Sequence, residues 1–311
     1  MMKTLSRLTG ISTIACCAMI GGRPADAGMT TKTEVYATRG ERTLEIHLHF
    51  PEGWKAEDKR SSIIFFFGGG WSNGTPDQFL DQAEYFASRG MVAARADYRV
   101  KSRDGVTPDD CVRDARSAVR WMKKNAPKLG IDPEQMVSSG GSAGGHLAAC
   151  MMIEDSVEAP DDDLTISTTP AAMILFNPVL SFESPELSKR LGERDDLARK
   201  ISPNAYLNKS TPPSLILFGS KDRLIGLADP YWQKAEKLGV RAERYIAEGK
   251  GHGFFNKSPW RERTLIAADK FLASLGLLEG TPALKEPIVA TAAQTNEIQR
   301  SSIRNGCKIS S

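Results

Sequence analysis

The chain has 311 residues, 41% of them hydrophobic and 25% charged, and a formal net charge of +3. This length and composition are those of a globular domain with a sizeable core. Lysine and arginine are scattered, so the sequence lacks the concentrated basic stripe that nucleic-acid binding needs. With only four histidines, and without an H-E-x-x-H motif or zinc-spaced cysteine pairs, catalysis by a bound metal is also excluded.

Residues 1–27 resemble a processing segment. Lys3 and Arg7 are positive, residues 8–20 are mostly apolar, and residues 25–27 read Ala-Asp-Ala, a small-residue cleavage site. The pattern predicts a signal peptide and export to the periplasm or the outside of the cell, with Gly28 as the first mature residue. A buried N-terminal helix is the alternative.

Cysteine usage gives two further expectations. Cys16 leaves a lipid anchor as a less favoured alternative to simple cleavage. The later cysteines, Cys111, Cys150 and Cys307, are odd in number and form no disulfide framework. A bridge between Cys111 and Cys150 stays open, but buried free thiols are favoured. No later stretch approaches the roughly 20 apolar residues that span a bilayer.

From about residue 33 to 276, strand-like and helix-like patterns alternate, which predicts one α/β domain with a mostly parallel sheet and helices on both faces. Thr75, Pro76 and Gln78 indicate a helix start with a capping box. In chain order, strands are expected at 44–50, 63–67 and 91–96, with helices from 75 to about 90 and from 107 to 123. The basic residues of the second helix, Arg113, Arg116, Arg120 and Lys123, are expected to face solvent.

The second half of the pattern continues with a strand at 135–139 and a helix at 146–152. Strands at 171–176, 214–218 and 241–247 and a helix at 265–275 complete it. The catalytic domain is thus expected to span residues 28–280. Segment 154–170 is acidic and polar, segment 181–213 is a candidate lid insertion, and residues 281–311 have the composition of a disordered tail.

Gly140-Gly141-Ser142-Ala143-Gly144 matches the G-x-S-x-G nucleophile elbow and lies between a predicted strand and a predicted helix, the context that the motif requires. The sharp turn needs glycine on both sides of the serine. A glycine-rich phosphate loop is the alternative, but the lysine of that loop is missing. Ser142 is therefore the predicted nucleophile.

A serine hydroxyl needs a base, and histidine suits that role. His252 lies in a glycine-rich loop after the last predicted strand, at the edge where α/β enzymes gather catalytic groups. His47 and His49 share one face of an early strand and are expected to be packing or surface residues. His146 lies one helical turn beyond Ser142 and is the weaker candidate.

The base in turn needs a carboxylate, and Asp222 follows the strand at 214–218, which gives the chain order serine, acid, histidine. Asp229 is the second candidate, with an alternative role at a helix start.

Backbone amides must stabilise the oxyanion of an acyl-transfer intermediate. Gly68-Gly69-Gly70 follows a strand end, so the amides of Gly69, Gly70 and Ala143 are the predicted donors. A tight structural turn is the alternative for the glycines. Trp71 is a weak candidate for substrate contact.

Five motifs in order resemble the hormone-sensitive-lipase-like and feruloyl/acetyl-xylan esterase branch of the α/β hydrolases over residues 45–276. They are Phe67-Gly68-Gly69-Gly70-Trp71, Asp97-Tyr98-Arg99 and the segments 140–146, 219–224 and 249–254. The resemblance implies the α/β-hydrolase fold and a triad of Ser142, Asp222 and His252. It also implies the same oxyanion hole and esters of acylated sugars or small acyl groups as substrates, with no cofactor.

Two positions depart from the family pattern. Phe67 stands where the family usually has a histidine, which leaves the loop's conformation open, and Gly141 replaces an acidic residue, which favours the xylan-esterase branch. A serine peptidase of the prolyl-oligopeptidase type and a non-catalytic relative remain as alternatives. The first usually carries an additional large domain, and the second typically lacks a triad member.

Overall fold

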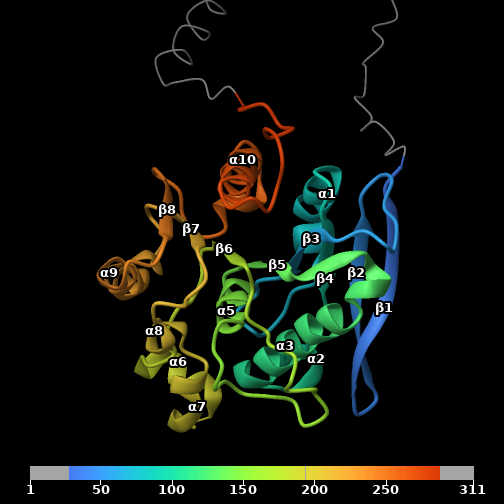
Figure 1. The fold of residues 1–311 in the computed structure, drawn as a ribbon. Coiled ribbons are helices and arrows are strands. Elements are labelled where there is room, and N and C mark those ends of the chain that lie inside the picture. The colour runs from blue at the N-terminus through green and yellow to red at the C-terminus, as the bar shows by residue number, and fades with distance from the viewer. Residues whose placement is uncertain (1–27, 193, 288–311) are drawn as a thin grey trace, which may run out of the picture.

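The fold of a computed structural model, which describes residues 28–192 and 194–287, is built around one eight-stranded sheet (Figure 1). The strands are β1 (Thr30–Arg39), β2 (Arg42–Phe50), β3 (Arg60–Phe66), β4 (Val92–Ala96), β5 (Ile131–Gly141), β6 (Ala172–Phe176), β7 (Ser214–Gly219) and β8 (Ala242–Ala247). Their order is β1-β2-β4-β3-β5-β6-β7-β8. The pairings β1–β2 and β2–β4 are antiparallel, and all others are parallel.

Helices cover both faces of this sheet. The longer ones are α1 (Leu80–Ser88), α3 (Pro108–Lys124), α5 (Ala143–Cys150), α9 (Asp229–Leu238) and α10 (Trp260–Ala273). The short ones are α2 (Lys101–Asp104), α4 (Ala126–Leu129), α6 (Pro185–Ser188), α7 (Asp195–Lys200) and α8 (Pro203–Tyr206), with 3-10 turns η1 (Pro76–Phe79), η2 (Lys189–Leu191), η3 (Ile225–Ala228) and η4 (Phe254–Asn256). Figure 1 shows α1 and α10 on one face and α3, α5 and α9 on the other, and each set packs over its own apolar core. The predicted α/β-hydrolase fold is confirmed.

The central strands are buried along their whole length. All five residues of β6 and all six of β7 are buried, as expected for parallel strands with helices on both faces. Since the carboxyl ends of β3, β5, β6, β7 and β8 meet at one edge, loops far apart in the sequence lie together there.

The prediction that the basic residues of the second helix face solvent is wrong. Arg116 and Arg120 in α3 are 2% and 5% exposed, because the acidic segment 154–170 folds over them. Arg120 Nη1 lies 2.6 Å from Glu158 and 2.8 Å from Asp162, and Arg116 also pairs with Glu158. Buried charges need such partners, so the acidic segment is a counter-charge for this helix.

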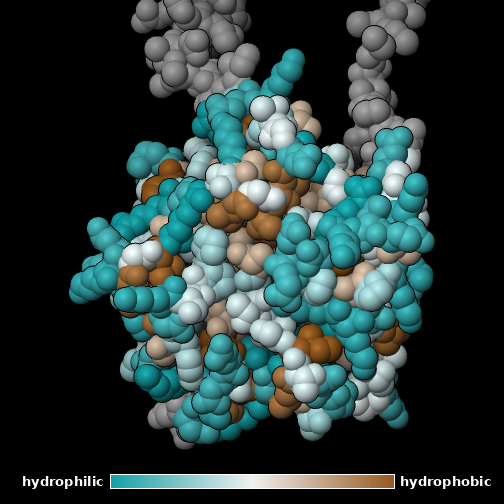
Figure 2. Space-filling view, in the orientation of Figure 1, coloured by the Kyte–Doolittle hydropathy of each residue, from teal (hydrophilic) through white to brown (hydrophobic). Residues whose placement is uncertain are grey.

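Other expectations have mixed outcomes. Cys111 and Cys150 are buried free thiols, as favoured. The predicted signal peptide and residues 288–311 of the predicted tail lie outside the described residues, and residues 281–287 contain neither helix nor strand. Among the described helices, none is both long and apolar enough to cross a membrane. In Figure 2 hydrophobic residues occupy only small areas between hydrophilic ones on this face of the molecule.

Candidate active site

Ser142 occupies the sharp turn between β5 and α5. Its backbone has φ 55° and ψ −115°, a strained conformation for a residue with a side chain. A Cβ atom at Gly140 would lie 2.4 Å from the Gly144 carbonyl oxygen, and one at Gly144 would lie 2.0 Å from the Phe66 carbonyl oxygen. Only glycine fits at both positions, so the geometry of the turn accounts for the two glycines of the sequence motif.

His252 and Asp222 reach the same edge from the loops after β8 and β7. His252 Nε2 lies 2.9 Å from Ser142 Oγ, and His252 Nδ1 lies 2.7 Å from Asp222 Oδ2. Because an ionised carboxylate only accepts, Nδ1 carries the proton and Nε2 is left to accept the serine proton. The structure therefore brings together the three side chains that the sequence singled out.

The environments of the acid and the base differ. The Asp222 side chain is fully buried, whereas 41% of the His252 side chain is exposed. Asp222 also accepts hydrogen bonds from Asn177 Nδ2 at 2.7 Å and from the Leu224 amide at 2.9 Å. The second candidate acid, Asp229, is the exposed first residue of α9 and takes no part.

The glycine loop after β3 lies against the elbow. A Cβ atom at Gly68 would be 2.9 Å from the Gly141 carbonyl oxygen and 3.4 Å from Ser142 Cβ. Gly69 and Gly70 have φ values of 123° and 63°, and a Cβ atom at Gly69 would lie 2.0 Å from the Asn73 carbonyl oxygen. The loop therefore needs glycine both for its backbone angles and for its close approach.

Three amides of the glycine loop and the elbow have no acceptor of their own among the described residues. Within residues 28–192 and 194–287, Gly69, Gly70 and Ala143 donate no hydrogen bond to another backbone or side-chain acceptor. The amide of Gly68, by contrast, donates to Gln78 Oε1 at 2.5 Å. Free amides at the glycine loop and at the first residue of α5 are what an oxyanion hole requires.

Gln78 has a different role from the predicted one. Its side chain closes no capping box, because its Oε1 accepts from Gly68 while its Nε2 donates to Asn256 Oδ1 at 3.1 Å. Asn256 Nδ2 donates in turn to the Gly253 carbonyl at 2.9 Å. Gln78 thereby links the glycine loop to the loop that carries His252.

Phe67 supports the glycine loop in place of the histidine usual in the family. Its ring stacks on Tyr98 with centroids 4.0 Å apart, and the Tyr98 hydroxyl donates to the Phe67 carbonyl at 2.6 Å. The loop is thus held by an aromatic stack and one buried hydrogen bond.

The remaining histidines have structural partners. His146 is fully buried, its Nε2 lies 2.7 Å from the Ile201 carbonyl, and its Nδ1 accepts from Trp71 Nε1 at 3.3 Å. Burial lowers its pKa to about 4. His49 accepts from Arg95 Nε at 3.0 Å and is buried too, while His47 contacts Thr33 on the surface. None of them is the base.

Trp71, the candidate for substrate contact, packs against neighbouring aromatic rings. It is 4% exposed and meets His146 and Phe182 edge-on, with ring centroids 5.3 and 4.9 Å apart. Phe182 belongs to segment 181–213, hereafter the cap segment, whose short helices lie together beside α5 in Figure 1. Arg190 of this segment donates to the Gly70 carbonyl at 3.0 Å. The candidate lid insertion therefore borders the site; its movement as a lid stays a prediction.

Asn177 is the functional residue that sequence reasoning missed. It directly follows β6, is fully buried and has a positive φ of 47°. Its Nδ2 donates to Asp222, and its Oδ1 accepts from the Gly253 amide at 3.2 Å. A polar residue at the carboxyl end of a buried strand was the available signal. Among the described residues, no group of three or more His, Cys, Asp or Glu could hold a metal ion.

The fold and this serine, histidine and aspartate arrangement define an α/β-hydrolase. Residues 46–186 match the model of the BD-FAE family. Thermogutta terrifontis esterase 2, solved after phosphoramylation by tabun, is 43% identical with a TM-score of 0.76, over 81% of this chain and 97% of that chain. The chain belongs to the α/β-hydrolase esterases.

Curated relatives are more distant. The acetylxylan esterase of Xylanibacter ruminicola is 25% identical over 76% of this chain and 49% of its own length. The probable carboxylic ester hydrolase LipM of Mycobacterium tuberculosis is 26% identical over 72% and 56%. The chain spans about half of the length of such relatives.

Proposed function

We propose that this protein is a serine carboxylic ester hydrolase that works through an acyl-enzyme. The observation that carries the proposal is His252, which is hydrogen-bonded at once to Ser142 and to a buried carboxylate. Membership of the esterase family supports it.

The chemistry follows from the atoms. Ser142 Oγ attacks the ester carbonyl carbon as its proton passes to His252 Nε2, and Asp222 stabilises the imidazolium that forms. The amides of Gly69, Gly70 and Ala143 stabilise the oxyanion, each typically worth about 3 kcal/mol. His252 then protonates the departing alcohol, and water activated by the same imidazole releases the acid and restores the serine.

The substrates we propose are acetyl or feruloyl esters of carbohydrates, or other short-chain esters. The similarity to an acetylxylan esterase supports the first group. A solved structure of the similar Thermogutta esterase with bound propionate supports small acyl groups. Release assays on acetylated xylan, feruloyl esters and short alkyl esters would rank them.

The test of the nucleophile is Ser142→Ala. We expect the folded variant to lose hydrolysis of p-nitrophenyl acetate and labelling by a fluorophosphonate probe, because Ser142 Oγ, which His252 contacts, forms the acyl-enzyme. Ser210→Ala, on an exposed turn before β7, is the matched control and should keep both. Turnover that persists in Ser142→Ala would reject the assignment, and cleavage of peptide amides but not of esters would favour a peptidase.

We also propose that the protein is exported, on the charge and hydropathy pattern of residues 1–27. The mature protein recovered from outside the cytoplasm should then begin at Gly28 by mass spectrometry. Recovery of an uncleaved chain from the cytoplasm would contradict this proposal.

A further inference from the structure

A cavity of about 300 Å³ lies beside the glycine loop. Gly70 and Trp71 form one wall, Lys101 of α2 and Pro108 of α3 form another, and η2 of the cap segment closes the third. Gly70, whose amide is one of the predicted oxyanion donors, thus also lines this cavity. The cavity is therefore connected to the candidate site through Gly70.

The charged groups around this cavity are all cationic. Lys101, Lys189 and Arg190 line it, and among its described lining residues there is no carboxylate. Arg190 is held in place, since it donates to the Gly70 carbonyl at 3.0 Å and its guanidinium carbon lies 5.6 Å from the centre of the Trp71 ring. Lys101 and Lys189 are both exposed, and neither forms a salt bridge with a side chain that the structure describes. Both ammonium groups can therefore reach an anion in the cavity.

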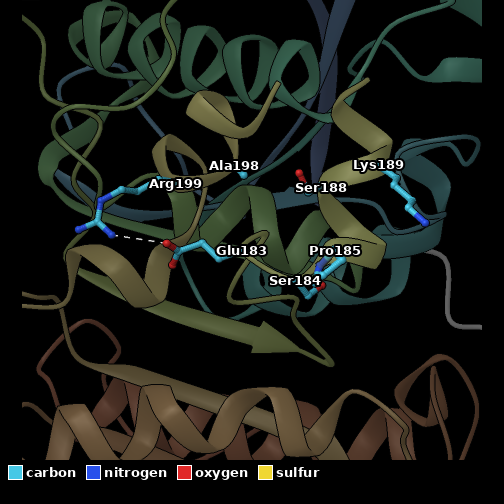
Figure 3. A pocket seen from close by; sticks show the side chains of 7 residues that line it. All are labelled: Glu183, Ser184, Pro185, Ser188, Lys189, Ala198 and Arg199. Atoms are coloured by element: carbon cyan, nitrogen blue, oxygen red, sulfur yellow. Dashed lines mark hydrogen bonds and ion pairs between the residues drawn. The ribbon is translucent and has the colours of Figure 1, made fainter. Parts of the chain in front are cut away.

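A second cavity shows the contrast. It has a volume of about 640 Å³, lies within the cap segment and is lined by charges of both signs (Figure 3). Glu183 and Arg199 face each other across one side at 3.5 Å, and Lys189 extends on the opposite side of the view. In this second cavity Glu183 offsets one of the two cations, Lys189 and Arg199. The lining of the cavity beside the glycine loop contains three cations and no carboxylate among its described residues, so it attracts an anion more strongly.

We propose that the cavity beside the glycine loop binds a carboxylate carried by the ester substrate, on its acid or on its alcohol. The inference rests on the proposed ester hydrolysis. Two exposed ammonium groups, and one guanidinium held by the Gly70 carbonyl, attract an anion to this concave site and orient it. Because Gly70 belongs both to the wall of the cavity and to the predicted oxyanion loop, the anion would be carried on a part of the substrate that extends past this loop. The protein would accordingly prefer acidic esters to neutral ones.

The test compares matched esters with the full-length mature protein. For an anion on the alcohol, 4-acetoxybenzoate is compared with 4-acetoxybenzamide. For an anion on the acid, monomethyl glutarate is compared with its neutral amide, methyl 4-carbamoylbutanoate. We expect a higher kcat/KM for the acid of one pair at low ionic strength, and a smaller preference at high salt, because exposed charges are screened. The pair that responds identifies which side of the ester enters the cavity.

The double variant Lys101→Gln with Lys189→Gln should lower kcat/KM for the preferred anionic ester by about three- to tenfold, a typical effect of two exposed charges. Hydrolysis of the neutral partner should change less than about twofold on the same grounds. The matched control is Lys59→Gln with Lys124→Gln, two exposed lysines near the amino ends of β3 and β5 that line another cavity. It should change neither ester.

Equal kcat/KM for acids and amides in both pairs, or an equal loss on both substrates in the Lys101 and Lys189 variant, would overturn the proposal while ester hydrolysis itself stands. A protein that cleaves none of the four esters and no p-nitrophenyl acetate would instead overturn the proposed function.

Discussion

Asn177 joins the acid and the base of the candidate site. One end of its side chain donates to Asp222 Oδ2, the other accepts from the amide of Gly253, and its own amide donates to the Leu217 carbonyl at 2.8 Å. Because all three partners belong to other segments, a displacement of Asn177 would move the carboxylate and the histidine loop relative to each other. We regard it as a positioning residue.

Replacing Asn177 tests this role. Asn177→Gly tolerates the positive φ but loses both side-chain hydrogen bonds, and we expect kcat to fall by about 10- to 100-fold through misplacement of the base. KM should stay within about twofold, because the residue touches no substrate. Steady-state kinetics on p-nitrophenyl acetate measures both values.

Asn177→Ala is the companion variant. It loses the same hydrogen bonds and adds backbone strain of roughly 1 kcal/mol, so its melting temperature should fall below that of Asn177→Gly while its kcat is similar. A rise in KM with unchanged kcat in both variants would contradict a positioning role.

Local motifs explain which residues could be predicted from the sequence. Ser142 is marked by glycines within two positions, and Asp222 and His252 by their places after strands. Asn177 also follows a strand, but the roles of Asn177 and Gln78 depend on partners that lie 45 and 178 residues away in the chain. Side-chain hydrogen bonds between distant loops depend on how the loops meet, and periodicity does not encode this.

At the scale of elements, hydrophobic periodicity located the strands and helices well but misjudged one polar surface. The face of α3 that carries Arg116 and Arg120 has the pattern of a solvent-exposed face. The pattern describes one helix and contains no information about Glu158 and Asp162, which reach it from a later segment. A helix face buried in an ion-pair network and a solvent-exposed basic face have the same pattern of residues in the sequence of that helix.

The cap segment shows the same limit. Its place between two strands was visible as a break in the alternation, and its four short helical pieces, α6, η2, α7 and α8, are too short for periodicity to detect. Its contacts with Gly70 and Trp71 connect it to the glycine loop. The ends of the cap segment were thus predictable, and its internal helices and its contacts with other elements were not.

At the scale of the whole molecule, two buried histidines make stability depend on pH. Burial lowers the pKa of His146 from 6.5 to about 4, and burial together with the charge of Arg95 lowers that of His49 from 6.5 to about 4. In the unfolded chain both rings take up protons near pH 6.5, whereas in the folded protein they resist until about pH 4. The stabilisation is therefore complete above 6.5 and declines as the pH falls toward 4.

We expect the free energy of unfolding to be lower at pH 5 than at pH 7.5 by an amount of the order of 3 kcal/mol. Urea titrations at the two pH values measure it. His146→Gln removes one titrating ring and should reduce the difference between the two pH values, even though the variant is less stable at both. An unchanged difference in that variant would contradict the assignment to His146.

The overall architecture was predictable because alternation of strands and helices, together with a sharp glycine turn after a buried strand, restricts the topology to few solutions. The antiparallel β1–β2 pair and the order of strands in the sheet depend on pairings across the chain. They became visible only in the structure.

The cap segment departs from β6 and rejoins the sheet at β7, and these two strands are hydrogen-bonded neighbours. The sheet itself holds the two ends of the segment together, so segments of other lengths could replace it at little entropic cost. Ser142, Asp222 and His252 all lie outside the cap segment. Related proteins could therefore differ in substrate through replacement of the cap segment alone, while the three catalytic side chains stay in place.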